Sequence, residues 1–483
     1  MALSLEAGVQ AALRDAFAAA GVQVEDVPLR KVPNADGWGF ATQLALKYGG
    51  QNAQALAEQV VARLQAAGQF ERAEAIRGYV NVYVGVASAA RQVIDSVLAE
   101  GERYGAGAPK AARYMVEYSC PNTHKVFGVH HLRPTAFGNA IARLLSFSGY
   151  QVATDNYIGD IGAHVIRCLW CLQRYHASEE PPADRLDWLG GIYVEATERL
   201  EAGEPDAKEE VADLFTRWQH GDAELLRLWR ETRQWSLAEM ERIYRQLDVH
   251  FDHWYFESEV EAEGDRVAQE LIDRGIAEYS DGLPIVRLPD KLGVLPIRRS
   301  DGTSLYQTKE LALSLRKFRE HPIEQSIVIS DVAQSLYFKQ VYKVLELYGF
   351  ERVKDLIHLS YERVNLPSGK LSSRLGNVPT YEDLAEEAIR RVSAIVAEKN
   401  PSLPLNERHE VAEQVAISAL KFAMLNVSNN SVITFEWERV LDFDGFAGPY
   451  VQYAYVRAAR ILERAAESGL ELSTSALRTR HSA

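Results

Sequence analysis

The stretch Val116-Glu-Tyr-Ser-Cys-Pro-Asn-Thr-His-Lys-Val-Phe-Gly-Val-His-His-Leu-Arg133 decides the fold. A strand pattern over Tyr114–Ser119 leads into it, and a helical pattern over Pro134–Ser148 follows. The next strand pattern is Tyr150–Asn156, and the order strand, loop, helix, strand opens a parallel α/β unit. Such a loop aims backbone N–H groups and the helix dipole at one point, which favours a bound anion.

Charged side chains in this loop have the chemistry of a phosphate site. Lys125, His130 and His131 suit a polyphosphate whose negative charge grows in a transition state, and the alternative is a polar surface loop. A second segment, Gly369–Asn377 with the sequence GKLSSRLGN, places Lys370 and Ser372 near glycines. It can wrap a pyrophosphate through charge-assisted hydrogen bonds, although many surface loops share this composition.

Composition describes a large globular protein. The 483 residues predict about two to four domains, and 47% hydrophobic and 25% charged residues exclude a disordered or fibrous chain. No window approaches about 18 uninterrupted apolar residues, so we expect no membrane span. The amino terminus lacks a signal-peptide layout, which favours the cytoplasm. The net charge of −14 argues against a nonspecific nucleic-acid coat but allows a local basic face.

Regions outside the first α/β unit extend the pattern. The amino-terminal part predicts a helix at 1–20, a helical pattern over Phe40–Ala67, a strand at Gly78–Val84 and a helix at about 87–100, followed by a linker at Gly105–Pro109. Residues 176–248 predict a helical insertion. Strands at Ile327–Ser330 and Leu356–Ser360 flank a helix at 333–348, and nearly everything from Tyr381 onward is expected to be helical.

Cysteines and aromatic residues in the insertion have a simple interpretation. Three cysteines form no disulfide framework, and Cys168-Leu-Trp-Cys171 offers too few thiolates for a zinc site. We therefore predict a helix interior and no metal. The aromatic residues nearby are interpreted as packing; they are Trp170, Tyr175, Trp188, Tyr193, Trp218 and Trp229.

Taken together, the two phosphate-type segments resemble the HIGH and KMSKS motifs of class I aminoacyl-tRNA synthetases. The resemblance narrows to the arginyl-tRNA synthetases and runs from about residue 20 to 465. It rests on Pro121-Asn122 with Lys125 and Leu132-Arg133, on Asn156–Asp160, on Asp301–Glu310, on Gly445–Tyr455, and on the amino-terminal segments Phe40–Ala45 and Gly78–Asn81.

This resemblance implies an α/β fold with a Rossmann-type parallel sheet. It implies a small α/β domain at 1–105 that contacts the tRNA elbow in the family, and a catalytic domain at 110–380 with a helical insertion at about 170–250. It also implies an anticodon-binding-type helical domain at 381–483. Only 28 residues follow Tyr455, so this last domain is expected to be shortened.

The resemblance also implies a reaction and its residues. L-Arginine is activated with ATP and Mg²⁺ to arginyl-adenylate and transferred to tRNA(Arg), with no permanently bound cofactor, by a protein expected to be a monomer away from membranes. The catalytic residues implied are Lys125, His130, His131, Lys370 and Ser372. Those for ATP are Val129, His131 and Lys370. Those for arginine are Glu117, Asn122, Glu257, Tyr306, Glu310 and Gln334.

Three departures from the family pattern bear on activity. The HIGH position reads Gly128-Val129-His130-His131, so His130 either crowds the adenine or replaces the missing first histidine. Ser373 stands where KMSKS has its second lysine, while Lys125 is retained. Glu310 replaces the usual aspartate. Two alternatives remain open: a paralogue that activates an amino acid for another acceptor, and an inactive descendant that binds arginine or tRNA.

Overall fold

The computed structural model describes residues 2–32, 38–299, 302–303, 305–365, 379–442 and 445–469. The chain divides into a first unit that contains residues 1–107 and a second unit, Ala108–Ile461. No helix of the described chain is long and apolar enough to cross a bilayer. Each unit is described separately below.

The first unit is an antiparallel sheet with the strand order β1-β2-β4-β3, packed against helices. Its elements are α1 (Ala2–Ala19), β1 (Arg30–Lys31), β2 (Trp38–Thr42), α2 (Leu44–Gly49), α3 (Ala53–Ala67), β3 (Arg72–Ile76), β4 (Tyr79–Val84) and α4 (Val86–Glu100). The prediction of one helical stretch over Phe40–Ala67 is wrong. Phe40 and Thr42 alternate as buried residues of a strand paired with β4, and a turn at Gly50 separates α2 from α3.

The second unit is built on a five-stranded parallel sheet with the order β12-β11-β5-β6-β7. The strands are β5 (Arg113–Glu117), β6 (Gln151–Ile158), β7 (His253–Phe256), β11 (Gln325–Asp331) and β12 (Leu356–Tyr361). From β5 the chain adds strands first on one side and later on the other, so β5 is the topological switch point. Ligands of open parallel sheets bind at the carboxyl ends of the strands at such a point. The predicted fold class is confirmed.

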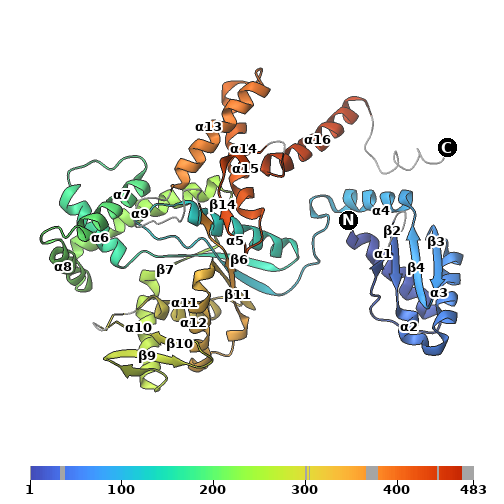
Figure 1. Cartoon of the computed structure of the whole chain (residues 1–483), viewed down its shortest axis with the longest axis horizontal. Helices are drawn as coiled ribbons and strands as arrows, with labels where there is room; N and C mark the ends of the chain where they lie inside the picture. Colours follow the sequence, from blue (N-terminus) through green and yellow to red (C-terminus); the bar gives the residue numbers. More distant parts are fainter. Residues whose placement is uncertain are drawn as a thin grey trace. The chain divides into compact units, whose positions relative to one another are not determined.

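Helices cover this sheet and form the insertion, which Figure 1 shows gathered to one side of the second unit. They are α5 (Val129–Phe147), α6 (Ala163–Tyr175), α7 (Arg185–Glu201), α8 (Ala207–Gln219), α9 (Ala223–Gln246), α10 (Glu257–Asp273), α11 (Tyr306–Glu320) and α12 (Ser335–Tyr348). A small antiparallel sheet lies between α10 and α11 in the chain, formed by β8 (Glu278–Ser280), β9 (Leu283–Leu288) and β10 (Gly293–Pro296).

The carboxyl-terminal part packs directly onto the sheet layer. Its elements are α13 (Tyr381–Lys399), α14 (Leu405–Leu425), α15 (Trp437–Val440) and α16 (Gly448–Glu467), with β13 (Val364–Asn365) paired to β14 (Ile433–Thr434). Leu384, Ala388 and Leu420 from α13 and α14 are buried in the same hydrophobic core as Leu132 of α5. This region is mainly helical, as predicted, and it fixes the helix that follows the site loop.

Candidate active site

The loop between β5 and α5 is held in a strained conformation. Ser119, Cys120 and His124 all have positive φ angles, of 75°, 49° and 59°. Residues with side chains rarely adopt this left-handed region, and each costs of order 1–3 kcal/mol unless its surroundings enforce it. Strain of this kind is typical of a site whose geometry matters more than local stability.

Buried hydrogen bonds from the insertion enforce that conformation. His124, fully buried, lies with Nε2 2.7 Å from the Thr232 hydroxyl, and its backbone N–H donates to Ser236, both on α9. Burial lowers the pKa of His124 to about 3, so the ring is neutral. Ser119 bonds the Tyr244 hydroxyl, also on α9, at 2.8 Å. The helical insertion therefore holds the site loop in this conformation through hydrogen bonds from α9.

Lys125 and the two histidines lie together at the start of α5. The Lys125 ammonium lies 5.0 Å from the centre of the Tyr193 ring on α7, and the rings of His130 and His131 are 3.9 Å apart. Burial and then the charge of Lys125 lower the pKa of His130 to about 4. The pKa of His131 is held well below its usual range by burial, by His130 and by Lys125. A cationic site that suppresses further protonation is suited to an anion.

The first turn of α5 contains a buried polar atom without a partner. His131 Nδ1 accepts from the Gly128 backbone N–H at 3.3 Å, while His130 Nδ1 is buried and has no hydrogen-bond partner within the described ranges. Val129 is fully buried and holds the turn in the core. Unpaired buried polar atoms are rare in folded proteins, so each needs an explanation such as a missing ligand.

Lys370 and Ser372 lie outside the described residues, but both flanks of their segment are fixed against α5. The Tyr381 backbone N–H donates to Phe127 O at 2.7 Å, and the Val129 N–H donates to Pro379 O at 3.3 Å. On the other side, Arg133 donates to the carbonyl of Arg363 at 3.3 Å. The described residues on either side of that segment, Arg363 and Pro379–Tyr381, are therefore neighbours of the site loop and α5.

A cluster of carboxylates and lysines occupies the carboxyl ends of β5 and β6. Glu117 is buried and bonded to Lys317 of α11, whose Nζ also lies 2.6 Å from Asp155 Oδ2. Glu310, two turns before Lys317 on the same face of α11, is buried, and burial followed by the charge of Glu117 raises its pKa to about 8. The carboxyl groups of this cluster thus disfavour one another's ionisation, and a further positive charge beside them would favour their charged forms.

Glu257 stands at the start of α10, where a buried anchor fixes it. Asp160, fully buried, accepts from the backbone N–H and hydroxyl of Ser258 at 2.9 and 2.7 Å and from Arg233 at 2.8 Å. Burial raises the pKa of Glu257, and Lys309, 3.7 Å away, opposes the shift.

Glu310 acts electrostatically on three buried tyrosines. After burial, its charge is the largest cause of the raised pKa of Tyr337 and of Tyr342, and for Tyr157 it follows burial and the charge of Glu257. The hydroxyl groups of Tyr157 and Tyr342 are buried without a hydrogen-bond partner in the part of the chain that is described. This cluster therefore combines buried carboxyl groups with unpaired polar groups, which are suitable partners for a cation that carries several hydrogen-bond donors.

The other predicted arginine residues lie at the same edge of the sheet with different exposure. Asn122 forms a parallel bridge with Gly159, where a side chain at Gly159 would collide with the Asn122 amide. Tyr306 is 54% exposed and its ring lies 4.8 Å from that of Tyr337. Gln334 is exposed in the turn that follows β11. Of the six, only Glu117 and Glu310 are fully buried.

Sequence reasoning missed the residues that complete the pocket. Asp155 is the register partner of Glu117 on the adjacent strand, and Lys317 lies seven residues after Glu310 on one face of α11. The helical spacing was visible in the sequence. The pairing of Lys317 with Glu117 and Asp155 was not, because the partners are far apart in the chain.

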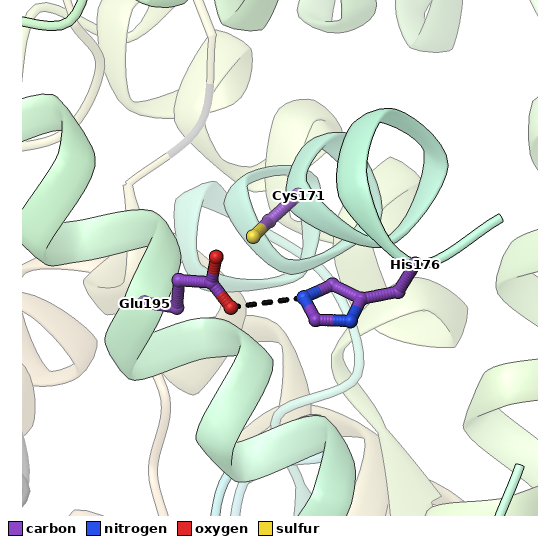
Figure 2. Close-up of side chains that lie close together, drawn as sticks. All are labelled: Cys171, His176 and Glu195. Atoms are coloured by element: carbon purple, nitrogen blue, oxygen red, sulfur yellow. Dashed lines mark hydrogen bonds and ion pairs between the residues drawn. The ribbon is translucent and has the colours of Figure 1, made fainter. Parts of the chain in front are cut away.

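One cluster in the insertion has metal-ligand types. The ligand atoms of Cys171, His176 and Glu195 lie within 4.8 Å of one another, and Figure 2 shows the sulfur facing the gap between the other two. Glu195 is already paired with Arg199 at 2.6 Å, and His176 lies 2.9 Å from both Glu195 and Glu179. Burial raises the pKa of the Cys171 thiol to about 12. The two carboxylates, Glu179 and Glu195, raise the pKa of His176 against the opposing effect of burial.

Comparison with known proteins identifies the family. Residues 93–437 match the family described as "tRNA synthetases class I (R), catalytic domain", and residues 4–84 match "Arginyl tRNA synthetase N terminal domain". The chain belongs to the arginyl-tRNA synthetase family. The predicted resemblance is therefore confirmed.

Relatives of the arginyl-tRNA synthetase family cover most of the chain. The arginine–tRNA ligase of Alkaliphilus metalliredigens is 33% identical over 416 residues, which are 85% of this chain and 73% of that protein. That of Bdellovibrio bacteriovorus is 35% identical over 390 residues, 79% of this chain and 67% of that protein. The structure of Thermus thermophilus arginyl-tRNA synthetase is 26% identical, with a TM-score of 0.71 over 95% of this chain and 82% of that chain.

Proposed function

We propose that the site described above activates L-arginine with ATP and transfers it to tRNA(Arg). The chain is an enzyme of the arginine–tRNA ligase family. Its own residues support a particular division of the work: carboxylates and tyrosines around Glu310 bind arginine, and the start of α5 binds the ATP phosphates.

The excess of buried negative charge carries the arginine assignment. Four largely buried carboxyl groups, Glu117, Asp155, Glu257 and Glu310, face two buried ammonium groups, Lys309 and Lys317. Because the pKa of Glu310 is about 8, three carboxylates face two ammonium groups near pH 7, and a bound cation would bring out the fourth negative charge. Free arginine brings two cationic groups, the guanidinium and the α-ammonium. The guanidinium offers five donors in a fixed fork, which suits carboxylates and tyrosine oxygens better than the point charge of lysine does.

We assign ATP to the end of the β5–α5 loop that leads into α5, away from Glu117. Lys125, His130 and His131 are proposed to face the negative charge that grows as pyrophosphate leaves, with the buried Val129 fixing the helix start. Lys370 and Ser372 of the second segment are proposed to contribute to the same site. Mg²⁺ is proposed to enter with ATP, because it keeps mostly phosphate and water ligands. The arginine carboxylate attacks the α-phosphorus, an oxygen–phosphorus bond forms, and the bond to the pyrophosphate oxygen breaks.

Binding measurements test the arginine pocket directly. Calorimetry with the full chain should detect L-arginine and reject L-lysine by about 100-fold or more, since the fork geometry is lost. Glu257→Gln should weaken arginine by about 2–5 kcal/mol because a buried cation then loses its partner. Equal binding of the two amino acids, or of neither, would refute the assignment.

Exchange and charging assays separate this function from the two alternatives. Arginine-dependent ATP–pyrophosphate exchange should occur with tRNA present, and labelled arginine should appear on tRNA(Arg). Exchange without charging would favour a different acceptor, and arginine binding without exchange would indicate an inactive descendant. Lys370→Ala should slow exchange about 10²–10³-fold if it is a preorganised donor.

We also propose a role for the first unit, an oligomeric state and a cellular compartment. The first unit is assigned to the tRNA elbow, consistent with its match to the family's amino-terminal domain. The enzyme is proposed to act as a monomer and in the cytoplasm, and sedimentation and cell fractionation test these two points.

A further inference from the structure

A three-residue charge cluster lies beneath the proposed arginine pocket. Lys317 of α11 contacts Glu117 at the end of β5 and lies 2.6 Å from Asp155 on β6. The side chains of Lys317, Glu117 and Asp155 are 2%, 3% and 0% exposed. We call these three residues the buried triad. Its charges are almost fully removed from water, so their balance has large energetic effects.

Sheet geometry forces the two acids together. Glu117 and Asp155 are register partners on adjacent parallel strands, so their side chains project from the same face of the sheet. Two adjoining carboxylates cannot both stay ionised without a cation, which Lys317 supplies. With both acids ionised, two negative charges and one positive charge give the buried triad a net charge of −1. Burial raises the pKa of Glu117, the charge of Lys317 opposes that shift and Asp155 adds to it.

Asp155 adds a buried charge to the triad that the stability of the fold does not require. The Asp155 carboxylate is paired with Lys317, at 2.6 Å from Oδ2, and interacts with the Glu117 side chain, and it has no further hydrogen-bond partner among the residues described. A simple pair of Lys317 with Glu117 would already be neutral. Burying one more poorly bonded carboxylate costs stability, which points to a use for its charge.

That charge acts on the pocket. Glu117 and Asp155 are both causes of the raised pKa of Glu310, and Glu117 also acts on Tyr157 and Tyr342. The triad therefore contributes to the electrostatic potential that an arginine cation would meet, although Asp155 itself lies below the pocket lining.

We propose that Lys317 and Asp155 are positioning residues for arginine. Lys317 fixes the Glu117 carboxylate, and Asp155 keeps the triad net negative so that Glu117 can hold a substrate cation without giving up Lys317. The inference rests on the proposed function, specifically on Glu117 as part of the arginine site. No atom of Asp155 or Lys317 needs to touch the substrate.

Charge arithmetic predicts the effect of each variant. Asp155→Asn preserves the shape and makes the triad neutral, so Lys317 competes with arginine for Glu117. Lys317→Met leaves two adjoining carboxyl groups that share a proton, so the net charge stays at −1 but the Glu117 carboxylate is held by that proton and Asp155 and is no longer fixed by Lys317. Each single variant should raise the KM for arginine by about 10-fold or more with a small change in kcat, in line with the loss of one buried charge interaction. The double variant D155N/K317M again has a net charge of −1 and should recover part of the arginine affinity.

The experiment measures KM and kcat by ATP–pyrophosphate exchange with tRNA(Arg), varying arginine and then ATP, on the full chain. Thermal unfolding checks that every variant folds. Asp248→Asn is the control, since it changes an exposed aspartate paired with Arg143 at 2.6 Å. Lys317→Arg should retain most of the arginine affinity because it preserves the charge.

The outcomes separate this inference from the proposed function. An unchanged KM for arginine in Glu117→Gln would refute the arginine site itself. A raised KM in Glu117→Gln with an unchanged KM in Asp155→Asn would overturn only the role of the triad. Equal losses for ATP and arginine, or additive losses in the double variant, would show a purely structural role and also overturn it. A loss confined to arginine, with recovery in the double variant, supports it.

Discussion

Glu310 is a carboxyl group whose ionisation should change when substrate binds. In the free protein, burial and neighbouring carboxylates raise its pKa to about 8. A guanidinium beside it would stabilise the charged form and lower that pKa. Glu310 has one methylene more than the aspartate that is usual in the family, so its carboxyl group lies at the end of a longer side chain.

Proton release on arginine binding follows from these two states. Between the bound and free pKa values the free carboxyl is protonated and the bound one is not, so near pH 7 binding should release close to one proton. Arginine affinity should rise with pH up to about 8 and then level off. Calorimetry in buffers of different ionisation enthalpy measures the release.

Variants on the same helix assign that proton. Glu310→Gln should abolish the release and weaken arginine binding. Glu320→Gln should not change either quantity, because Glu320 lies on the outer part of α11 in an ion pair with Arg316 at 2.7 Å. Release that persists in Glu310→Gln would assign the proton to another group.

His130 should contribute to catalysis rather than obstruct it. Its ring lies 3.9 Å from that of His131, and both histidines respond to the charge of Lys125, so the three share one anion-binding environment. His130→Gly should therefore lower the rate of ATP–pyrophosphate exchange, by about 10-fold or more for a lost preorganised donor. Faster exchange, or a lower KM for ATP, would support the opposite account in which the ring crowds the adenine.

At the residue level, the sequence could name candidates for direct contact with the substrates but not the residues that support them. Glu117, Glu310, Lys125 and the two histidines could be named because each stands in a motif that resembles the family. Lys317 could not, because its partners are contributed by two strands far away in the chain. Long-range ion pairs leave no local periodicity to detect.

At the level of elements, α7 positions the site loop. Gly190 of α7 packs against Val126, and a side chain there would lie 2.8 Å from the Val126 backbone nitrogen. The next residue, Gly191, is exposed and has nothing within 4 Å of an added side chain. These neighbouring glycines on one helix form a matched pair.

Alanine at the two positions should have opposite effects. Gly190→Ala should lower the free energy of unfolding by about 1–3 kcal/mol and reduce exchange activity, because overpacking displaces the loop that carries Lys125. Gly191→Ala should raise the free energy of unfolding by up to about 1 kcal/mol through helix propensity alone. Urea unfolding and exchange assays measure both. Similar behaviour of the two variants would argue against a role of α7 in holding the loop.

Elements were predictable where their pattern was long or repeated. The strands and helix that open the parallel sheet, and the helical insertion, follow from periodicity. The strand β7 is only four residues long and rich in aromatic residues, and α5 begins at Val129, five residues before the predicted start at Pro134. Tertiary contacts determine that β7 forms and where α5 begins. Pairing with β6 stabilises β7. Hydrogen bonds from Val129 to Pro379 and from Tyr381 to Phe127 stabilise the start of α5.

At the scale of the whole molecule, the proposed active site belongs to the second unit, and the first unit has a hydrophobic core of its own. Every described residue of the proposed arginine and ATP sites belongs to Ala108–Ile461, whereas the first unit buries its own set, including Phe17, Phe40 and Val82. A unit with its own core can be removed without exposing the core of the other. Its exposed basic residues in the described ranges are Arg14, Arg30, Lys31, Lys47, Arg63, Arg72, Arg77, Arg91 and Arg103.

Deletion of residues 1–107 should therefore separate tRNA binding from arginine binding. Arginine affinity, measured by calorimetry, should stay within about 2-fold, because no pocket residue is lost. Affinity for tRNA(Arg) should fall and become less dependent on salt, since each lost phosphate contact removes released counterions and reduces the slope of log K against log salt by about 0.7–0.9. Filter binding at several salt concentrations gives that slope. The same slope with and without the first unit would mean that it makes no phosphate contacts, and the assignment to the tRNA elbow would then fail while the arginine site stands.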